Sequence, residues 1–442
     1  MREFGLWDGV DKLLLVPVVV LTLLLFFHVT SGRKVFVIVA VILSGINLLW
    51  IEDALPILVS GITTAGFIAT FLAALTALKH AASSSPSIQR CGRFLSQQPP
   101  GRRYAALTIG GQLFGLLLNY GAISLLGSMT MANASLERNE EIRLHRIRRM
   151  LLAIQRGFIS TLPWSPLSFA MVISTSLVPG TSWSLCLIPG MINGVILAGT
   201  GWLLDTLFKP KLSSTAIPQR QITDSWIALL PLGLLLLLLV LLLSIAYVLT
   251  GVRVLGLVIV IVPLLSIAWV AVQNRHDRPL QQVRQWSSVY LTRSLGEFRN
   301  ETVLLMMAGY IGTVASPILG LMMTHLDINL ASLPAWLILV TLVWLVPLLG
   351  QLGMNPILAV ALIAPVLPDA AELGVSPVAV AISLTAGWIL SGISSPFTAT
   401  TMLVGNFASI SSAQVGLRWN GVFTLVCGVA LSVWVVLYAG FA

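Results

Sequence analysis

The chain has 442 residues, of which 57% are hydrophobic and 9% charged, with a formal net charge of +9 and a mean hydropathy of +0.95. Soluble domains do not have this composition, so the sequence predicts an all-α polytopic membrane protein, which we expect in the inner membrane of a bacterium. The basic residues gather in a few loops, as on the cytoplasmic side of membrane proteins, so the positive charge indicates the lipid bilayer and no nucleic acid as a partner.

Three apolar spans open the chain, at 13–28, 35–50 and 55–78. The first continues without a convincing cleavage site, so we expect a retained span and not a signal peptide. A basic segment at 79–103 follows, and the positive-inside rule places it in the cytoplasm. Residues 1–103 are therefore predicted to form three scaffold spans and a cytoplasmic arm.

The next segment, 104–131, is rich in glycine and has a basic stretch on both sides. Because both flanks should be cytoplasmic, the segment cannot cross the membrane once. We expect a re-entrant hairpin with its tip near Asn119 and Ser124; a single glycine-rich span with a positive external loop is the alternative. Residues 135–150 are predicted to form an amphipathic helix on the membrane surface.

Two stretches, 157–168 and 387–398, match at a constant shift of 230 residues. Proline removes a backbone donor and disrupts the preceding turn, so each stretch predicts a membrane helix broken in the middle. Lipid tolerates such breaks only where they are buried in protein or line a polar cavity, and a matching pair points to a transporter's site. Two proline kinks in ordinary packed helices are the alternative. The matched residues are Gly157 with Gly387, Ser165-Pro166 with Ser395-Pro396, and Ser168 with Thr398.

The remaining elements complete two halves. A span at 184–208 ends the first transport half, 104–208. Residues 209–332 are predicted to hold a basic linker to residue 224, scaffold spans and a second cytoplasmic arm. The second transport half, 333–442, has a hairpin with its tip near Gly353 and Asn355, the second broken helix and a final span.

Each half therefore contains three scaffold spans, a re-entrant hairpin, a broken helix and a final span. An odd number of crossings in each half makes the two halves inverted repeats. The matched breaks should then lie near one another about a pseudo-two-fold axis at the membrane midplane.

This layout resembles the ion transporter superfamily, which includes divalent anion/sodium symporters and citrate and arsenite transporters. The resemblance covers nearly the whole chain in layout, but in residues only the hairpin tips and breaks. The divalent-anion branch has Ser-Asn-Thr signatures at the tips, where this chain has Asn119-Tyr120-Gly121-Ala122-Ile123-Ser124 and Gly353-Met354-Asn355-Pro356. The resemblance implies an elevator mechanism, in which 104–208 and 333–442 move against a scaffold that also forms a homodimer interface.

Hydroxyl and amide side chains gather at the tips and breaks. Helix N-termini aimed at the midplane bind anions, and the opposite helix ends offer carbonyl oxygens to Na⁺. We expect a secondary active transporter of a small anion, an organic acid or inorganic oxyanion, coupled to Na⁺ or H⁺ and without another cofactor. For any single serine or threonine, a role in helix packing is equally open. The candidate substrate-binding residues are Asn119, Ser124, Ser165, Ser168, Asn355, Ser394, Ser395, Thr398 and Thr400, and the candidate Na⁺ positions lie near Gly121, Pro163, Gly353 and Gly392.

The sequence also lacks certain features. No acidic residue falls near the tips or breaks, and Asp205 is near a membrane exit, which disfavours a proton antiporter with an intramembrane carboxylate. An intramembrane enzyme would need a catalytic constellation that the sequence does not show, so we do not expect an enzyme. A non-transporting scaffold subunit would not need two duplicated breaks. The three widely separated cysteines match no metal site and are expected to be packing residues.

Overall fold

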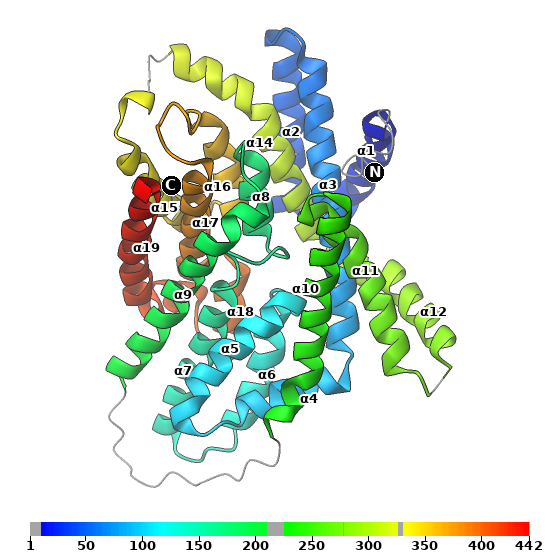
Figure 1. Ribbon diagram of the computed structural model, residues 1–442, viewed down its shortest axis with the longest axis vertical. Helices are drawn as coiled ribbons and strands as arrows, with labels where there is room; N and C mark the ends of the chain where they lie inside the picture. Colours follow the sequence, from blue (N-terminus) through cyan, green and yellow to red (C-terminus); the bar gives the residue numbers. More distant parts are fainter. Residues whose placement is uncertain (1–9, 210–224, 277, 326–329, 442) are drawn as a thin grey trace.

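The computed structural model describes residues 10–209, 225–276, 278–325 and 330–441, and this part of the chain is helical, without strands (Figure 1). Eight helical segments among these residues are long and apolar enough to cross a membrane. The chain is therefore an all-α, multi-pass integral membrane protein, as predicted. Most of the predicted linker, 210–224, lies outside the described residues.

The first half begins with three helices and a short helix that turns the chain. A hairpin, a broken helix and a long span follow. The bounds are α1 (Val10–His28), α2 (Ser31–Trp50), α3 (Ala54–Ser83), α4 (Pro86–Ser96), α5 (Pro100–Leu118), α6 (Gly121–Ala134), α7 (Glu140–Ile159), α8 (Phe169–Leu177) and α9 (Trp183–Leu207).

The second half also has three long helices, a hairpin, a broken helix and a last span, but in it a group of short helices comes before the third long helix. Its helices are η2 (Trp226–Leu229), α10 (Leu230–Thr250), α11 (Val254–Gln273), α12 (Pro279–Val289), the π-helix η3 (Tyr290–Ser294), α13 (Leu295–Glu297), α14 (Arg299–His325), η4 (Leu330–Ser332), α15 (Ala335–Gln351), α16 (Pro356–Ile363), η5 (Ala364–Val366), α17 (Pro377–Ser394), α18 (Ala399–Ala408), the π-helix η6 (Gln414–Trp419) and α19 (Gly421–Phe441).

The prediction of a separate surface helix at 135–150 was wrong. The structure has one continuous helix, α7, which begins at Glu140 and runs to the first break. Asn139 caps it by accepting a hydrogen bond from the backbone N–H of Ile142 at 3.2 Å. Every residue of this helix from Met150 to Ile159 is buried. The charged pattern therefore marks the half of α7 that lies outside the core, and no helix breaker separates it from the apolar half.

The two broken helices run in opposite directions through the molecule. In Figure 1, α7 leads from the lower end toward α8, whereas α17 descends toward α18. The hairpin α5–α6 packs against α7, and α15–α16 packs against α17. Each broken helix also reaches the other hairpin, because α8 contacts α16 and α18 contacts α6. Hairpins and broken helices thus form one interlocked unit with an inverted internal repeat.

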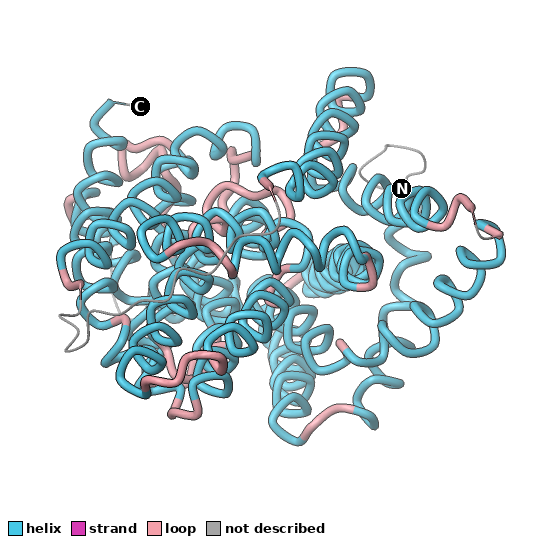
Figure 2. Tube along the Cα trace, turned by 90° about the horizontal axis from the view of Figure 1, so that it is seen from below, coloured by secondary structure: helices cyan, strands magenta, loops and turns pink. Residues whose placement is uncertain are grey.

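The other long helices form a second layer beside this unit. The helix α3 packs against α11 and α14, and α14 also packs against α2. Viewed from below, this layer lies near the N-terminal end of the chain, away from the C-terminal end (Figure 2). The first helix and the last span are therefore on opposite sides of the molecule.

Glycines allow the hairpins to touch the broken helices closely. A Cβ atom on Gly157 would collide with the carbonyl oxygen of Thr108 in α5. A Cβ atom on Gly387, its match in the repeat, would collide with the carbonyl oxygen of Leu342 in α15. The same backbone approach therefore occurs in both halves.

Candidate functional site

Each of the two helix breaks is held by an equivalent hydrogen bond of its own. Ser168 Oγ donates to the carbonyl oxygen of Leu162 at 2.7 Å, across six residues. Thr398 Oγ1 donates to the carbonyl oxygen of Gly392 at 3.0 Å, also across six residues. Both donor and acceptor positions are related by the shift of 230. The repeat seen in the residues is thus repeated in the bonds that shape the breaks.

Ser165 and Ser395 also have equivalent roles. The Ser165 Oγ atom accepts from the N–H of Leu167 at 3.1 Å, and the Ser395 Oγ atom accepts from the N–H of Phe397 at 3.2 Å. Each hydroxyl therefore closes a tight turn two residues long within its break. These bonds satisfy backbone groups that a break inside a membrane would otherwise leave unpaired.

The serine hydroxyls at the breaks are buried, and most of their hydrogen bonds are to backbone groups. The exposed fractions of Ser165, Ser168 and Ser395 are 2%, 3% and 0%. Thr400 Oγ1 also donates to the Gly392 carbonyl oxygen, which thus accepts two hydroxyls. Shaping the breaks is the role that the geometry shows for these side chains, while each hydroxyl oxygen keeps acceptor capacity for a ligand.

The first hairpin tip is a two-residue turn against α7. Asn119 has a φ of +51°, a left-handed value that asparagine tolerates better than most residues. The Tyr120 ring lies 5.3 Å from the Phe158 ring, one turn before the first break. Ser124, in the first turn of α6, is half-buried. A Cβ atom on Gly121 would meet the side chain of Lys79, so α3 touches this tip.

The second hairpin tip is bonded directly to the second break. Ser395 Oγ donates to the carbonyl oxygen of Gly350 at 2.7 Å, and Gln351 Nε2 donates to Ser394 Oγ at 3.2 Å. Asn355 caps α16 by accepting from the N–H of Ile357 at 2.9 Å. The end of α15 is therefore bonded to the second break, and Asn355 lies four residues beyond this contact along the chain.

The two tip-and-break clusters differ in accessibility. The second one is open, since Leu352 is 84% and Phe397 61% exposed, and the half-buried Asn355 and Thr398 lie beside them in the chain. The first is enclosed by α9, because Cβ atoms on Gly190 and Gly194 would collide with the backbone of the first break. The second cluster is therefore the more exposed of the two.

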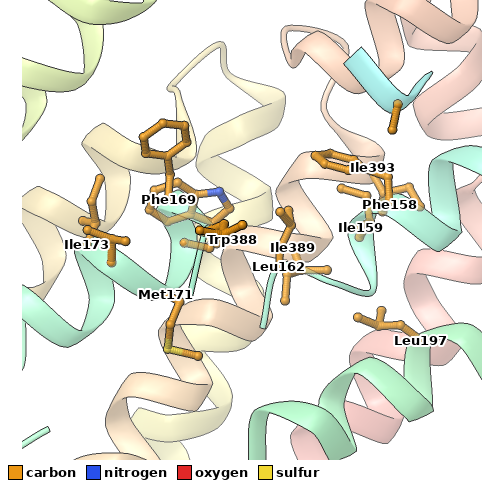
Figure 3. Close-up of a cluster of buried hydrophobic side chains, with 14 of the residues drawn as sticks. Phe158, Ile159, Leu162, Phe169, Met171, Ile173, Leu197, Trp388, Ile389 and Ile393 are labelled. Atoms are coloured by element: carbon orange, nitrogen blue, oxygen red, sulfur yellow. The ribbon is translucent and has the colours of Figure 1, made fainter. Parts of the chain in front are cut away.

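The crossing of the two broken helices is apolar. Figure 3 shows Phe158, Ile159 and Leu162 meeting Ile389 and Ile393. Among the described residues no hydrogen bond joins a hydroxyl of one break to the other break. The breaks are thus neighbours through hydrophobic contact, and the hydrogen bonds of these hydroxyls stay within each break or reach its own hairpin.

Arg156 was expected in a basic cytoplasmic stretch, but it is buried with an exposed fraction of 6%. Its Nε atom donates to Asn420 Oδ1 at 3.1 Å, and one terminal nitrogen donates to the Tyr104 hydroxyl at 3.3 Å. The guanidinium also lies 4.4 Å from the centre of the Phe423 ring. Sequence reasoning missed this residue; its one signal is that it directly precedes the glycine that opens the break.

Asp205 forms a two-pronged ion pair with Arg149, with N–O distances of 2.8 and 2.6 Å. This hydrogen bond raises the pKa of Arg149. The carboxylate therefore fastens α9 to α7 and is not free in the membrane interior. No group of three His, Cys, Asp or Glu residues suited to a metal occurs in the described part of the chain.

No protein-family model matches the sequence, and a comparison with curated proteins finds no match. Solved structures do share the fold. The YdaH transporter of Alcanivorax borkumensis superposes with a TM-score of 0.57 at 17% identity, over 92% of this chain and 99% of that one. MtrF of Neisseria gonorrhoeae, described within a class of antimetabolite efflux pumps, superposes with a TM-score of 0.58 at 13% identity, over 92% and 95%. This chain thus has the fold of membrane transporters.

Proposed function

We propose that the protein is a secondary active transporter of the ion transporter superfamily type, which moves a small anion by an elevator mechanism coupled to Na⁺ or H⁺. The observation that carries this proposal is the pair of inverted hairpin-and-break units with equivalent hydrogen bonds. Such pairs build central binding sites in transporters. The fold shared with two transporters supports it.

In this proposal, 104–208 and 333–442 move against a scaffold formed by α1–α3 and α10–α14, which also forms the homodimer interface in the inner membrane. The accessible second cluster receives the anion. The N-termini of α16 and α18 begin there, and their first-turn N–H groups have no partner within the helices. Carbonyl oxygens near Gly121, Pro163 and Gly353 are the proposed Na⁺ ligands.

The test is uptake of a panel of radiolabelled organic and inorganic anions by proteoliposomes, with a Na⁺ gradient, a pH gradient or neither. Thr398→Ala should lower uptake at limiting substrate by roughly ten- to a hundredfold, since a hydrogen bond to a charged ligand contributes about 1.5–3 kcal/mol. Ser165→Ala, in the enclosed first cluster, should lower uptake less, by loosening the turn that its hydroxyl closes. Thr206→Ala and Ser128→Ala are matched controls, because both side chains are exposed and bond only to their own helices.

Two results would count against the proposal. Uptake equal to that of empty liposomes under every gradient would rule out anion transport. Wild-type uptake by both break variants would remove these residues from the site. Thermal unfolding of each variant in detergent separates lost binding from lost stability, because these hydroxyls also hold the breaks.

A further inference from the structure

A cavity of about 480 Å³ lies between the scaffold and the first transport half. Its walls come from the middle of α3, the corner between α8 and α9, and the corner between α10 and α11. The helix α10 starts against α4 and ends at this cavity. The cavity is therefore on the side of the membrane opposite the basic arm at 79–103, and it is separate from both tip-and-break clusters.

The lining combines polar and aromatic groups with a single charge. Hydroxyl groups come from all three walls, including Thr63, Thr175 and Tyr247. Phe67 and Trp183 add aromatic surface. Arg253 is the one charged side chain among the residues that line the cavity, and no ion pair in the described structure involves it.

Backbone groups at the two corners include helix N-termini, and several of the carbonyl oxygens there are already engaged. Thr181 Oγ1 donates to the carbonyl oxygens of Thr175 and Val178 at the end of α8, and the N–H of Gly251 donates to the carbonyl oxygen of Tyr247 at the end of α10. The N-termini of α9 and α11 also lie at these corners. Ser182 Oγ accepts from the N–H of Leu185, and the Arg253 carbonyl oxygen accepts from the N–H of Gly256, so the N–H groups of the first two residues of each helix remain without intrahelical partners. A ligand that enters therefore meets N–H donors and a guanidinium, which suit an anion.

The size and charge of the cavity narrow the class of anion. Cavities of about 300–1,000 Å³ hold small organic molecules, so this volume is far larger than an inorganic oxyanion requires. Arg253, which is exposed, balances one negative charge, and no second cationic side chain lines the cavity to pair with another carboxylate. We propose that this cavity binds an organic monoanion with an apolar body, with its carboxylate on Arg253. That this anion is also the transported substrate rests on the proposed function.

Binding to the purified full-length protein in detergent, measured by isothermal titration calorimetry, tests the site independently of transport. Phenylacetate and hexanoate serve as organic monoanions, succinate as a dianion and sulfate as an inorganic oxyanion. We expect the monoanions to bind at least tenfold more tightly than succinate or sulfate. Arg253→Gln should weaken their binding at least tenfold, whereas Arg102→Gln, which removes an exposed arginine at the opposite end, should not.

A second pair of variants tests the volume. Ser176→Phe places a large ring in the cavity and should abolish binding, whereas Ser288→Phe on the exposed surface of α12 should leave it unchanged. The inference is overturned if neither monoanion binds, if sulfate binds equally well, or if Arg253→Gln binds as the wild type does. Binding with the expected pattern but no uptake by proteoliposomes would instead overturn the proposed transport function and leave the site in place.

Discussion

Arg156 carries a positive charge into the core, and in the described structure no carboxylate pairs with it. Its partners are the neutral oxygens of Asn420 and Tyr104 and the face of the Phe423 ring. A buried charge is expensive unless hydrogen bonds satisfy it. The planar guanidinium can reach these partners together, because its donors are held in a fixed fork. It thereby ties the first broken helix to the start of α19.

We expect Arg156→Lys and Arg156→Ala to lower the stability of the protein. A hydrogen bond to a charged group contributes about 1.5–3 kcal/mol, and the lysine ammonium cannot reproduce the fork. The midpoint of thermal unfolding in detergent measures the effect, with Arg418→Lys as the comparison because Arg418 is exposed. An Arg156→Lys protein as stable as the wild type would show that the directed bonds are unimportant.

The burial of Arg156 illustrates what the residues alone do not reveal. It is one of several arginines between 138 and 156, and its neighbours at the start of α7 are exposed or half-buried. Arg156 differs from them in its contacts with Asn420 and Phe423 at the start of α19, which bring the two segments together in space. The breaks, in contrast, were predictable, because proline and hydroxyl residues determine the backbone directly. Their bonds at Ser168 and Thr398 occur at the positions that the repeat predicted.

Among the helices, α7 was predicted as two separate helices, because its first turns are charged and the turns that follow are apolar. The structure shows one continuous helix. The candidate site was likewise predicted as symmetric, since the two breaks match in sequence. The structure makes them different, because α9 covers the first break through Gly190 and Gly194 while the second break stays open at Phe397. Which helix covers which break depends on tertiary packing, which the matched residues do not specify.

The contacts between hairpins and broken helices predict the effect of two matched substitutions. Gly157→Ala and Gly387→Ala should each destabilise the protein, because each Cβ atom would collide with a backbone carbonyl oxygen that cannot move aside like a flexible side chain. Overpacking of this kind costs about 1–3 kcal/mol. Thermal unfolding in detergent measures the loss.

Gly199→Ala is the control for this pair, since a Cβ atom there meets nothing within 4 Å. It should be neutral or stabilising by up to about 1 kcal/mol, because alanine favours the helix. Equal unfolding temperatures for Gly157→Ala and Gly199→Ala would contradict the close approach of α5 and α7.

For the molecule as a whole, the inverted repeat predicts which loops face each side of the membrane. Cysteines introduced at Ser84 and Ser288 should react with a membrane-impermeant maleimide only after permeabilisation, whereas one at Glu372 should react in intact cells. All three positions are exposed, and the native Cys91, Cys186 and Cys427 are buried. Labelling of Ser84→Cys or Ser288→Cys in intact cells would refute the predicted topology, which rests on the positive-inside rule.

The proposed elevator mechanism requires that contacts between the two layers break during transport. Phe71 of α3, in the scaffold, and Phe169 of α8, beside the first break, have ring centres 5.8 Å apart. If the transport halves slide along the scaffold, this pair must separate in every cycle. A covalent bridge between them should therefore stop transport, while a bridge inside one moving half should not.

We expect a short thiol cross-linker to abolish uptake by Phe71→Cys/Phe169→Cys proteoliposomes, and a reductant that cleaves the linker to restore it. The control is Trp344→Cys/Ser432→Cys, whose native side chains are hydrogen bonded at 3.1 Å between α15 and α19 of the same half. Cross-linking this control should leave uptake close to that of the untreated protein. Wild-type uptake by the fully cross-linked Phe71→Cys/Phe169→Cys protein would mean that α8 stays fixed against α3, and transport would then require a gating motion within a stationary core.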